Sequence, residues 1–115
     1  MARALKSDPS QIRDLQTAIA GLESRRAAIV AGGLERVGAQ IEHLQVLIAI
    51  RSHEQSIARY RNKPTDVRGA NKDITELTGE LRQLQKLRID DRLAELHDKA
   101  LRREQAANRL AEYTT

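Results

Sequence analysis

Six basic side chains in the middle of the chain have the clearest potential for chemistry. Residues 51–72 hold six Lys or Arg and two acids, so this stretch accounts for the formal net charge of +4. Guanidinium and ammonium groups donate strong hydrogen bonds to phosphate oxygens, and Arg can do so through two parallel bonds. The segment could bind the phosphates of duplex DNA or structured RNA, bind an acidic protein surface, or be an ordinary solvated loop. The candidate residues are Arg51, Arg59, Arg61, Lys63, Arg68 and Lys72.

Base recognition is not indicated by this sequence. Single-stranded nucleic acids are bound largely through bases stacked on aromatic rings, and Tyr60 is the one aromatic residue near the basic segment. Neither a zinc-finger pattern nor helix-turn-helix spacing is present. If the segment binds nucleic acid, we therefore expect contact with phosphates, independent of base sequence.

The side chains used most often in catalysis and metal binding do not form working patterns here. The absence of Cys excludes thiol nucleophiles, Cys-based zinc sites and disulfides. His43 and His53 are ten residues apart, whereas two metal ligands on one helical turn are separated by three or four; His97 is remote in sequence. Asp90 and Asp91 are adjacent, so on a helix they point about 100° apart and cannot act as an acid–base pair. We predict a non-enzymatic protein with no metal, cofactor or small-molecule substrate.

The elements that position the basic segment are amphipathic helices. Apolar residues recur every three or four positions on both sides of it, which predicts an all-α fold. We expect a long antiparallel helical hairpin of the coiled-coil type that assembles into a helical bundle. The hairpin would form a single domain over 9–112, with an apex loop at 62–72 and short tails at 1–8 and 113–115. The predicted seam residues are Ile12, Leu15, Ile19, Leu22, Val30, Leu34, Val37, Ile41, Leu44 and Ile48 before the loop, and Ile74, Leu77, Leu81, Leu84, Ile89, Leu93, Leu96, Ala100, Ala107 and Leu110 after it.

The glycine pair Gly32-Gly33 leaves the first helix open to two interpretations. Each glycine costs about 1 kcal/mol relative to alanine inside a helix, so the helix either breaks there or is packed closely against a neighbour. Residues 9–61 would span about 80 Å as one helix, against about 60 Å for 72–112. A break would remove this mismatch and give three helices. The step from Ile19 to Val30 is eleven residues, which suggests a four-residue insertion in the heptad pattern.

Further apolar residues beside the seam favour self-association. They widen the apolar face beyond what one partner helix covers, and such surfaces are usually covered by another chain. We therefore expect a homo-oligomer, a dimer or larger. These flanking residues are Leu47, Ile50, Ile57, Leu87 and Leu101.

Together these features favour a binding protein. We expect an accessory or regulatory protein of a bacterial, phage or mobile-element nucleic-acid machine, which contacts phosphates through the basic end of its hairpin. The alternative is an adaptor or inhibitor that docks a partner protein through its apolar stripe, without nucleic acid. An enzyme with a site built across an oligomer interface is a third reading. The 15 Arg against five Lys indicate a GC-rich bacterial or phage gene. With no signal sequence and no membrane span apparent, we expect a cytoplasmic protein.

Overall fold

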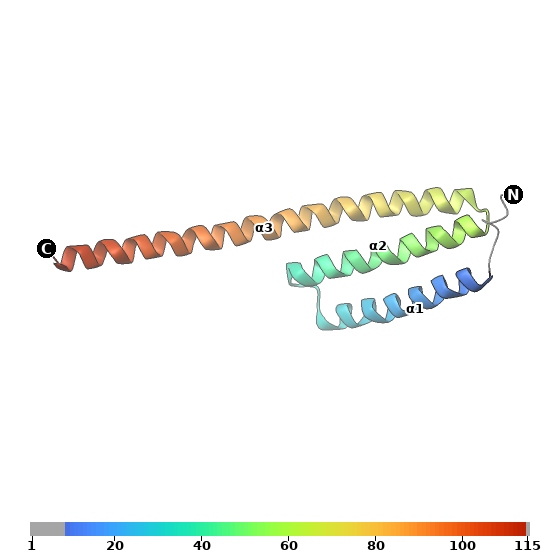
Figure 1. Cartoon of the computed structure of the whole chain (residues 1–115), viewed down its shortest axis with the longest axis horizontal. Helices are drawn as coiled ribbons and strands as arrows, with labels where there is room; N and C mark the ends of the chain where they lie inside the picture. Colours follow the sequence, from blue (N-terminus) through green and yellow to red (C-terminus); the bar gives the residue numbers. More distant parts are fainter. Residues whose placement is uncertain (1–8, 115) are drawn as a thin grey trace. The chain divides into compact units, whose positions relative to one another are not determined.

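The computed structural model describes residues 9–114, and in that range it consists of three α-helices. They are α1 (Pro9–Gly32), α2 (Val37–Tyr60) and α3 (Pro64–Thr114) (Figure 1). The all-α prediction is confirmed, and of the two predicted arrangements the chain adopts the one with three helices. It divides into two units, Met1–Leu84 and Gln85–Thr115, which we describe in turn.

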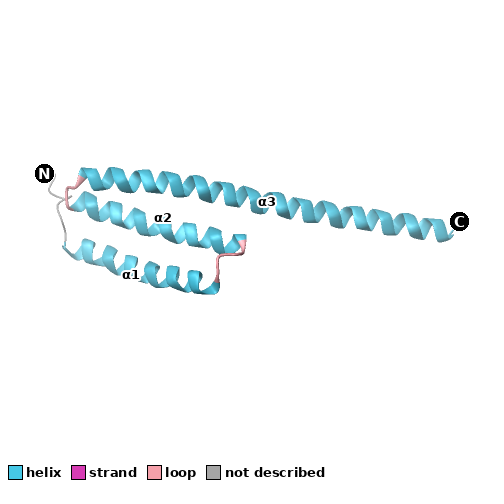
Figure 2. Ribbon diagram, turned by 180° about the vertical axis from the view of Figure 1, so that it is seen from behind, coloured by secondary structure: helices cyan, strands magenta, loops and turns pink. Residues whose placement is uncertain are grey.

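In the first unit, α2 is the central helix. It lies between α1 and the first part of α3 and runs antiparallel to both (Figures 1 and 2). Its central position follows from its sequence, which has apolar residues on more than one side. The core cluster joins Ile29 of α1 to Val46 and Ile50 of α2. Half-buried apolar residues surround this cluster: Ile19, Leu22 and Leu34.

The break between α1 and α2 lies at the glycine pair, as one of the two interpretations predicted. Helix α1 ends at Gly32, and Gly33 has φ +94°, a left-handed conformation that residues with a Cβ rarely adopt. The Gly33 amide donates a hydrogen bond to the Val30 carbonyl at 3.0 Å, which closes the last turn of the helix. A Cβ added at either glycine would meet no atom within 4 Å. The glycines therefore serve the turn and not a close helix contact.

The inserted stutter that the sequence suggested in α1 is wrong. Ile29 is buried, with 8% of its surface exposed, whereas Val30 is 49% exposed. If the exposed Arg26 is counted as one position of the seam, the seam of α1 repeats every three or four residues without interruption. Arg26 instead forms an ion pair with Glu23 at 3.3 Å. The pattern was misread because an arginine stands where an apolar residue was expected.

The turn between α2 and α3 is much shorter than the predicted apex loop at 62–72. Asn62 adopts φ +53°, its amide bonds to the Arg59 carbonyl at 3.1 Å, and the Lys63 amide bonds to the Ala58 carbonyl at 2.9 Å. This is a Schellman motif, in which a left-handed residue reverses the chain just after a helix. Pro64 then occupies the first position of α3, where its missing N–H costs nothing. The predicted start of the last helix at residues 71–73 is therefore wrong.

The flanking residues near the middle of the chain are covered within the chain itself. Ile50 is 5% exposed and Ile57 is 8% exposed, and Leu47 is half-buried. The reason is that α1 is a separate helix: its Ile29 packs against Val46 and Ile50 on a side of α2 that a two-helix hairpin would leave open. These three residues therefore give no support to self-association, which stays a prediction.

The second unit consists of the remainder of α3. Every side chain that the structure describes from residue 85 to 113 is exposed. Two ion pairs along the helix support it: Arg92–Glu95 at 3.3 Å and Asp98–Arg102 at 3.0 Å. Large exposed hydrophobic residues in this unit are Leu87, Ile89, Leu93, Leu96, Leu101, Leu110 and Tyr113. Within 9–114, none of the helices combines the length and the apolar character needed to span a bilayer.

Candidate nucleic-acid interface

Five of the six predicted basic residues are exposed near the α2–α3 turn. Among the residues that the structure describes, these five take part in no ion pair. An exposed cation without a carboxylate partner keeps its charge available to an external anion. The five are Arg59, Arg61, Lys63, Arg68 and Lys72.

Three of these residues converge on one hollow at the turn. Arg59 from the last turn of α2, Lys63 from the turn itself and Arg68 from the second turn of α3 line it together. The Schellman motif at Asn62 makes this possible, because it brings the two helix ends together within three residues. We call Arg59, Lys63 and Arg68 the basic tip. Its remaining lining residues are Asn62, Pro64 and Val67.

Arg61 and Lys72 lie to the sides of the basic tip. Arg61 lines a second hollow, where it shares the surface with Lys63 and with the acidic residues Glu54 and Asp66. These carboxylates reduce the positive potential on that side. Lys72 follows Arg68 by four residues on α3, so the two cations occupy the same face of the helix one turn apart. Lys72 therefore extends the positive surface along α3, whereas Arg61 adds less.

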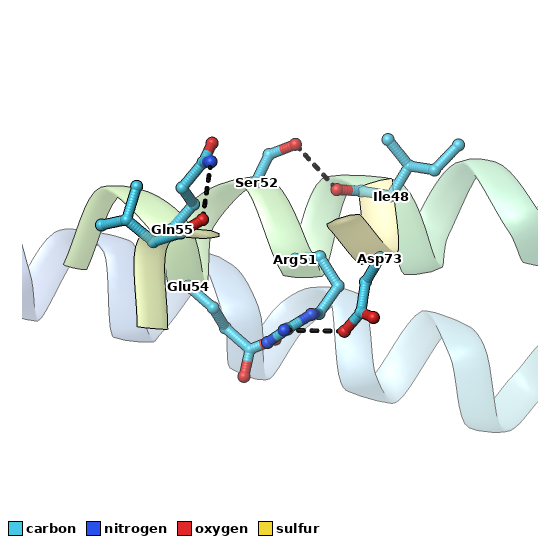
Figure 3. Close-up of polar contacts among 7 residues, drawn as sticks. Ile48, Arg51, Ser52, Glu54, Gln55 and Asp73 are labelled. Carbon is cyan, nitrogen blue, oxygen red and sulfur yellow. Dashed lines mark hydrogen bonds and ion pairs between the residues drawn. The ribbon is translucent and has the colours of Figure 1, made fainter. Parts of the chain in front are cut away.

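Arg51 does not belong to the basic tip. Its guanidinium forms ion pairs with Glu54 at 3.2 Å and with Asp73 of α3 at 2.8 Å (Figure 3). Burial lowers the pKa of Arg51, but the hydrogen bonds and charges of the two carboxylates outweigh this effect and raise the pKa above its ordinary value. The Nε atom is buried and without a hydrogen-bond partner within the described part of the chain. Arg51 thus ties α2 to α3, and its charge is already matched.

A second interhelical hydrogen bond stabilises the same pair of helices. The Gln55 side chain donates to the Val67 carbonyl at 3.2 Å, one turn closer to the basic tip than Arg51 (Figure 3). Ser52 on the same helix bonds back to the Ile48 carbonyl at 2.8 Å, so its hydroxyl is already used. The polar contacts of this region therefore fix α3 against α2 and hold Arg59 and Arg68 near each other.

The structure adds polar residues that the sequence analysis did not select. A hollow beside the basic tip is lined by Arg59 together with Ser56, Tyr60 and Asn62. The Tyr60 hydroxyl and the Asn62 amide are donors of the kind that contact phosphates in many complexes. The Ser56 hydroxyl already donates to the Ser52 carbonyl at 3.2 Å. Asn62 could have been identified from sequence, because Asn directly before Lys-Pro is a common way to end one helix and begin another. Ser56 gave no such indication, since its position depends on how α2 is turned.

Metal ligands do not cluster in the part of the chain that the structure describes. No group of three His, Asp or Glu side chains within 9–114 lies close enough to hold an ion. His43 and His53 are half-buried on α2, and His97 is exposed on α3. The Nε2 atom of His43 is buried and finds no hydrogen-bond partner among the described residues.

Comparison with known proteins gives no match for this chain, whether with protein-family models, curated protein sequences or solved structures. Function must therefore be argued from the basic tip and the helices that position it.

Proposed function

We propose that this protein is a non-enzymatic, self-associating accessory or regulatory protein of a bacterial, phage or mobile-element nucleic-acid machine. Its basic tip would bind the phosphates of duplex DNA or structured RNA. The observation that carries the proposal is the convergence of Arg59, Lys63 and Arg68 on one hollow. Each is exposed, and none forms an ion pair with a carboxylate of the described residues.

Phosphate groups fit this arrangement, and the carboxylates of an acidic protein surface would fit it as well. Two guanidinium groups and one ammonium group provide several donors around one hollow, and Arg can bind phosphate oxygens through two bonds. The helix dipoles contribute little, because the negative end of α2 lies beside the positive end of α3 and Asp66 occupies the first turn of α3. Charged side chains therefore supply the binding energy, so the affinity must depend steeply on salt.

Binding to a short DNA duplex at 50 and 200 mM salt tests the proposal. Four phosphate contacts, from the basic tip and Lys72, predict a loss of about a hundredfold in affinity over this range. The variant R59Q/K63Q/R68Q should bind at least tenfold more weakly at 50 mM salt. The variant R82Q/R88Q/R109Q is a matched control, because it removes three equally exposed arginines elsewhere and lowers the net charge equally.

Two outcomes would count against nucleic-acid binding. In the first, the parent protein does not bind DNA or RNA at 50 mM salt. In the second, both triple variants lose affinity equally, so that only the net charge matters. The adaptor or inhibitor reading would then be favoured, since exposed leucines of 85–113 offer an apolar surface to a partner helix. Docking of that kind responds little to salt.

A further inference from the structure

The hollow of the basic tip adjoins a second hollow that contains an aromatic ring. The second one is lined by Ser56, Arg59, Tyr60 and Asn62, and two of these residues, Arg59 and Asn62, also line the first. Ser56 precedes Arg59 by three positions and Tyr60 by four, so the three lie on one face near the end of α2. We call the second hollow the tyrosine hollow. The two hollows therefore meet at Arg59.

These two hollows differ in charge from others in the first unit. Within the described part of the chain, no carboxylate lines either of them. Three other hollows that contain arginine also contain acids. An anion at the basic tip therefore meets cations with no acid lining the same hollow, and the attraction is not cancelled locally. The acids elsewhere are Glu35 and Glu42 in one hollow, Glu54 and Asp66 in another, and Asp73, Glu76 and Glu80 in the third.

Three cations around one hollow favour an anion with more than one charge. Within a nucleic-acid strand, each phosphate is a diester and carries one negative charge. A phosphate at the end of a strand is a monoester, which carries about −1.5 to −2 charges at neutral pH and has three oxygens that accept strong hydrogen bonds. Arg59, Lys63 and Arg68 provide one cation for each of these oxygens. Because electrostatic attraction grows with the charge of the anion, the basic tip should bind a terminal phosphate more tightly than an internal one.

Tyr60 matches the other feature of a strand end, its last base. The side chain is half-buried and lines the tyrosine hollow, so part of it is open to solvent there. Any base can stack on an aromatic ring, because every base has a π face. Inside a duplex both faces of a base are covered by its neighbours, whereas the outer face of the last base is free. A single ring beside a phosphate site therefore suits one terminal nucleotide.

We propose that the ligand of this site is the phosphorylated end of a nucleic-acid strand. The terminal phosphate binds to the basic tip, and the terminal base stacks on Tyr60. This inference rests on the proposed function and narrows its ligand from the phosphates along a duplex to the phosphate at an end. Lys72, one turn beyond Arg68 on α3, remains available to a neighbouring phosphate.

Hairpin DNA with a single open end provides the first test. Three forms are compared at 50 mM salt: one with a 5′-phosphate, one with a 3′-phosphate and one with hydroxyl groups at both ends. One phosphorylated form should bind at least about tenfold more tightly than the hydroxyl form, the gain expected from one further charge-assisted contact. R59Q/K63Q/R68Q should lose this preference, whereas the control R82Q/R88Q/R109Q should keep it.

The outcomes of this test separate the inference from the proposed function. Equal binding of all three forms overturns the inference and leaves the proposed function intact, since that needs only the phosphates of the duplex. Loss of the preference in both triple variants also overturns the inference, because net charge alone would then explain it. Absence of binding to every form, in DNA and in the matching RNA hairpin, refutes both. Displacement of the hairpin by an equal concentration of adenosine monophosphate would mean a free-nucleotide site and overturn the inference.

The second test concerns the aromatic ring. Y60L should weaken binding of the preferred hairpin by about fivefold to a hundredfold, the range found for the stacking of one base on an aromatic ring. Y60F keeps the ring and should bind within about twofold of the parent, because the stacked ring is unchanged. The control Y113L removes the other tyrosine, which is 89% exposed in the second unit, and should leave the affinity unchanged. Unchanged affinity of Y60L overturns the stacking of the terminal base.

Fluorescence gives a readout that does not require changing Tyr60. The chain has no tryptophan and two tyrosines, so in the Y113F variant Tyr60 is the one strong fluorophore left. Its emission, corrected for absorption by the DNA, should fall when the phosphorylated hairpin binds, because a stacked base quenches the ring. Emission that stays constant while the hairpin binds overturns the stacking, even if Y60L proves unable to fold.

Discussion

The two units of this chain contain similar apolar stripes but cover them to very different extents. In the first unit, Ile41, Leu44 and Ile50 of α2 are each at most 8% exposed. In the second unit, Leu93 and Leu96 are about half exposed although their spacing is the same. The spacing of apolar residues shows that one face of a helix is apolar and must be buried against another element. It does not specify which helix covers that face, or whether any helix of the same chain does.

The largest expected effect on stability comes from truncating one apolar side chain in the stripe of each unit. Ile50→Ala removes buried atoms from the cluster with Ile29 and Val46, and should destabilise the first unit by about 2–4 kcal/mol. Leu93→Ala should change stability by less than about 0.5 kcal/mol, because Leu93 is 59% exposed. Urea unfolding followed by circular dichroism measures both. Equal costs at both sites would mean that Leu93 is covered within a single chain.

The turn between α1 and α2 offers the next largest effect, since it decides which helix covers α2. Gly33→Ala places a Cβ at φ +94° and should destabilise the protein by about 1–2 kcal/mol. Gly32→Ala is the matched control, because Gly32 is helical and a Cβ there meets open space. It should be neutral or stabilise by up to about 1 kcal/mol. A stabilising Gly33→Ala, seen as a rise in Tm, would argue that the helix can run through this position.

The sequence predicted the parts of the fold that depend on local chemistry. Helix type followed from spacing. The cost of two glycines inside a helix marked residues 32–33 as either a break or a close helix contact, without deciding between the two. The α2–α3 turn lies within the predicted loop at 62–72 but is shorter, because Pro64 begins α3, a position that proline favours. The covering of Ile50 by α1 could not be predicted, since it depends on how the chain folds back after the break.

The candidate site was predicted in composition but not in arrangement. All six basic residues could be selected from their density in sequence, and five are exposed. Distance along the chain gave no means to separate Arg51 from the others. Its partner Asp73 is 22 residues away and comes close only because α3 runs back along α2. The turn that brings Arg59 and Arg68 to one hollow likewise depends on Asn62. The left-handed conformation of this single residue decides how the two helices are placed.

The smallest expected effect on stability concerns Arg51. Its substitution distinguishes a cation with a structural role from the cations of the basic tip in the same unit. Arg51→Met keeps the apolar stem and removes the charge, so the ion pairs with Glu54 and Asp73 are lost. Because the carboxylates are largely exposed, we expect a loss of only about 1 kcal/mol in unfolding free energy. The raised pKa of Arg51 means that its charge is present throughout the pH range in which the protein is folded, so the parent's advantage should not vanish between pH 6 and 9. DNA affinity at 50 mM salt should change less than twofold, in contrast to R59Q/K63Q/R68Q. A variant that unfolds normally but loses DNA binding would place Arg51 among the phosphate contacts and enlarge the site along α2.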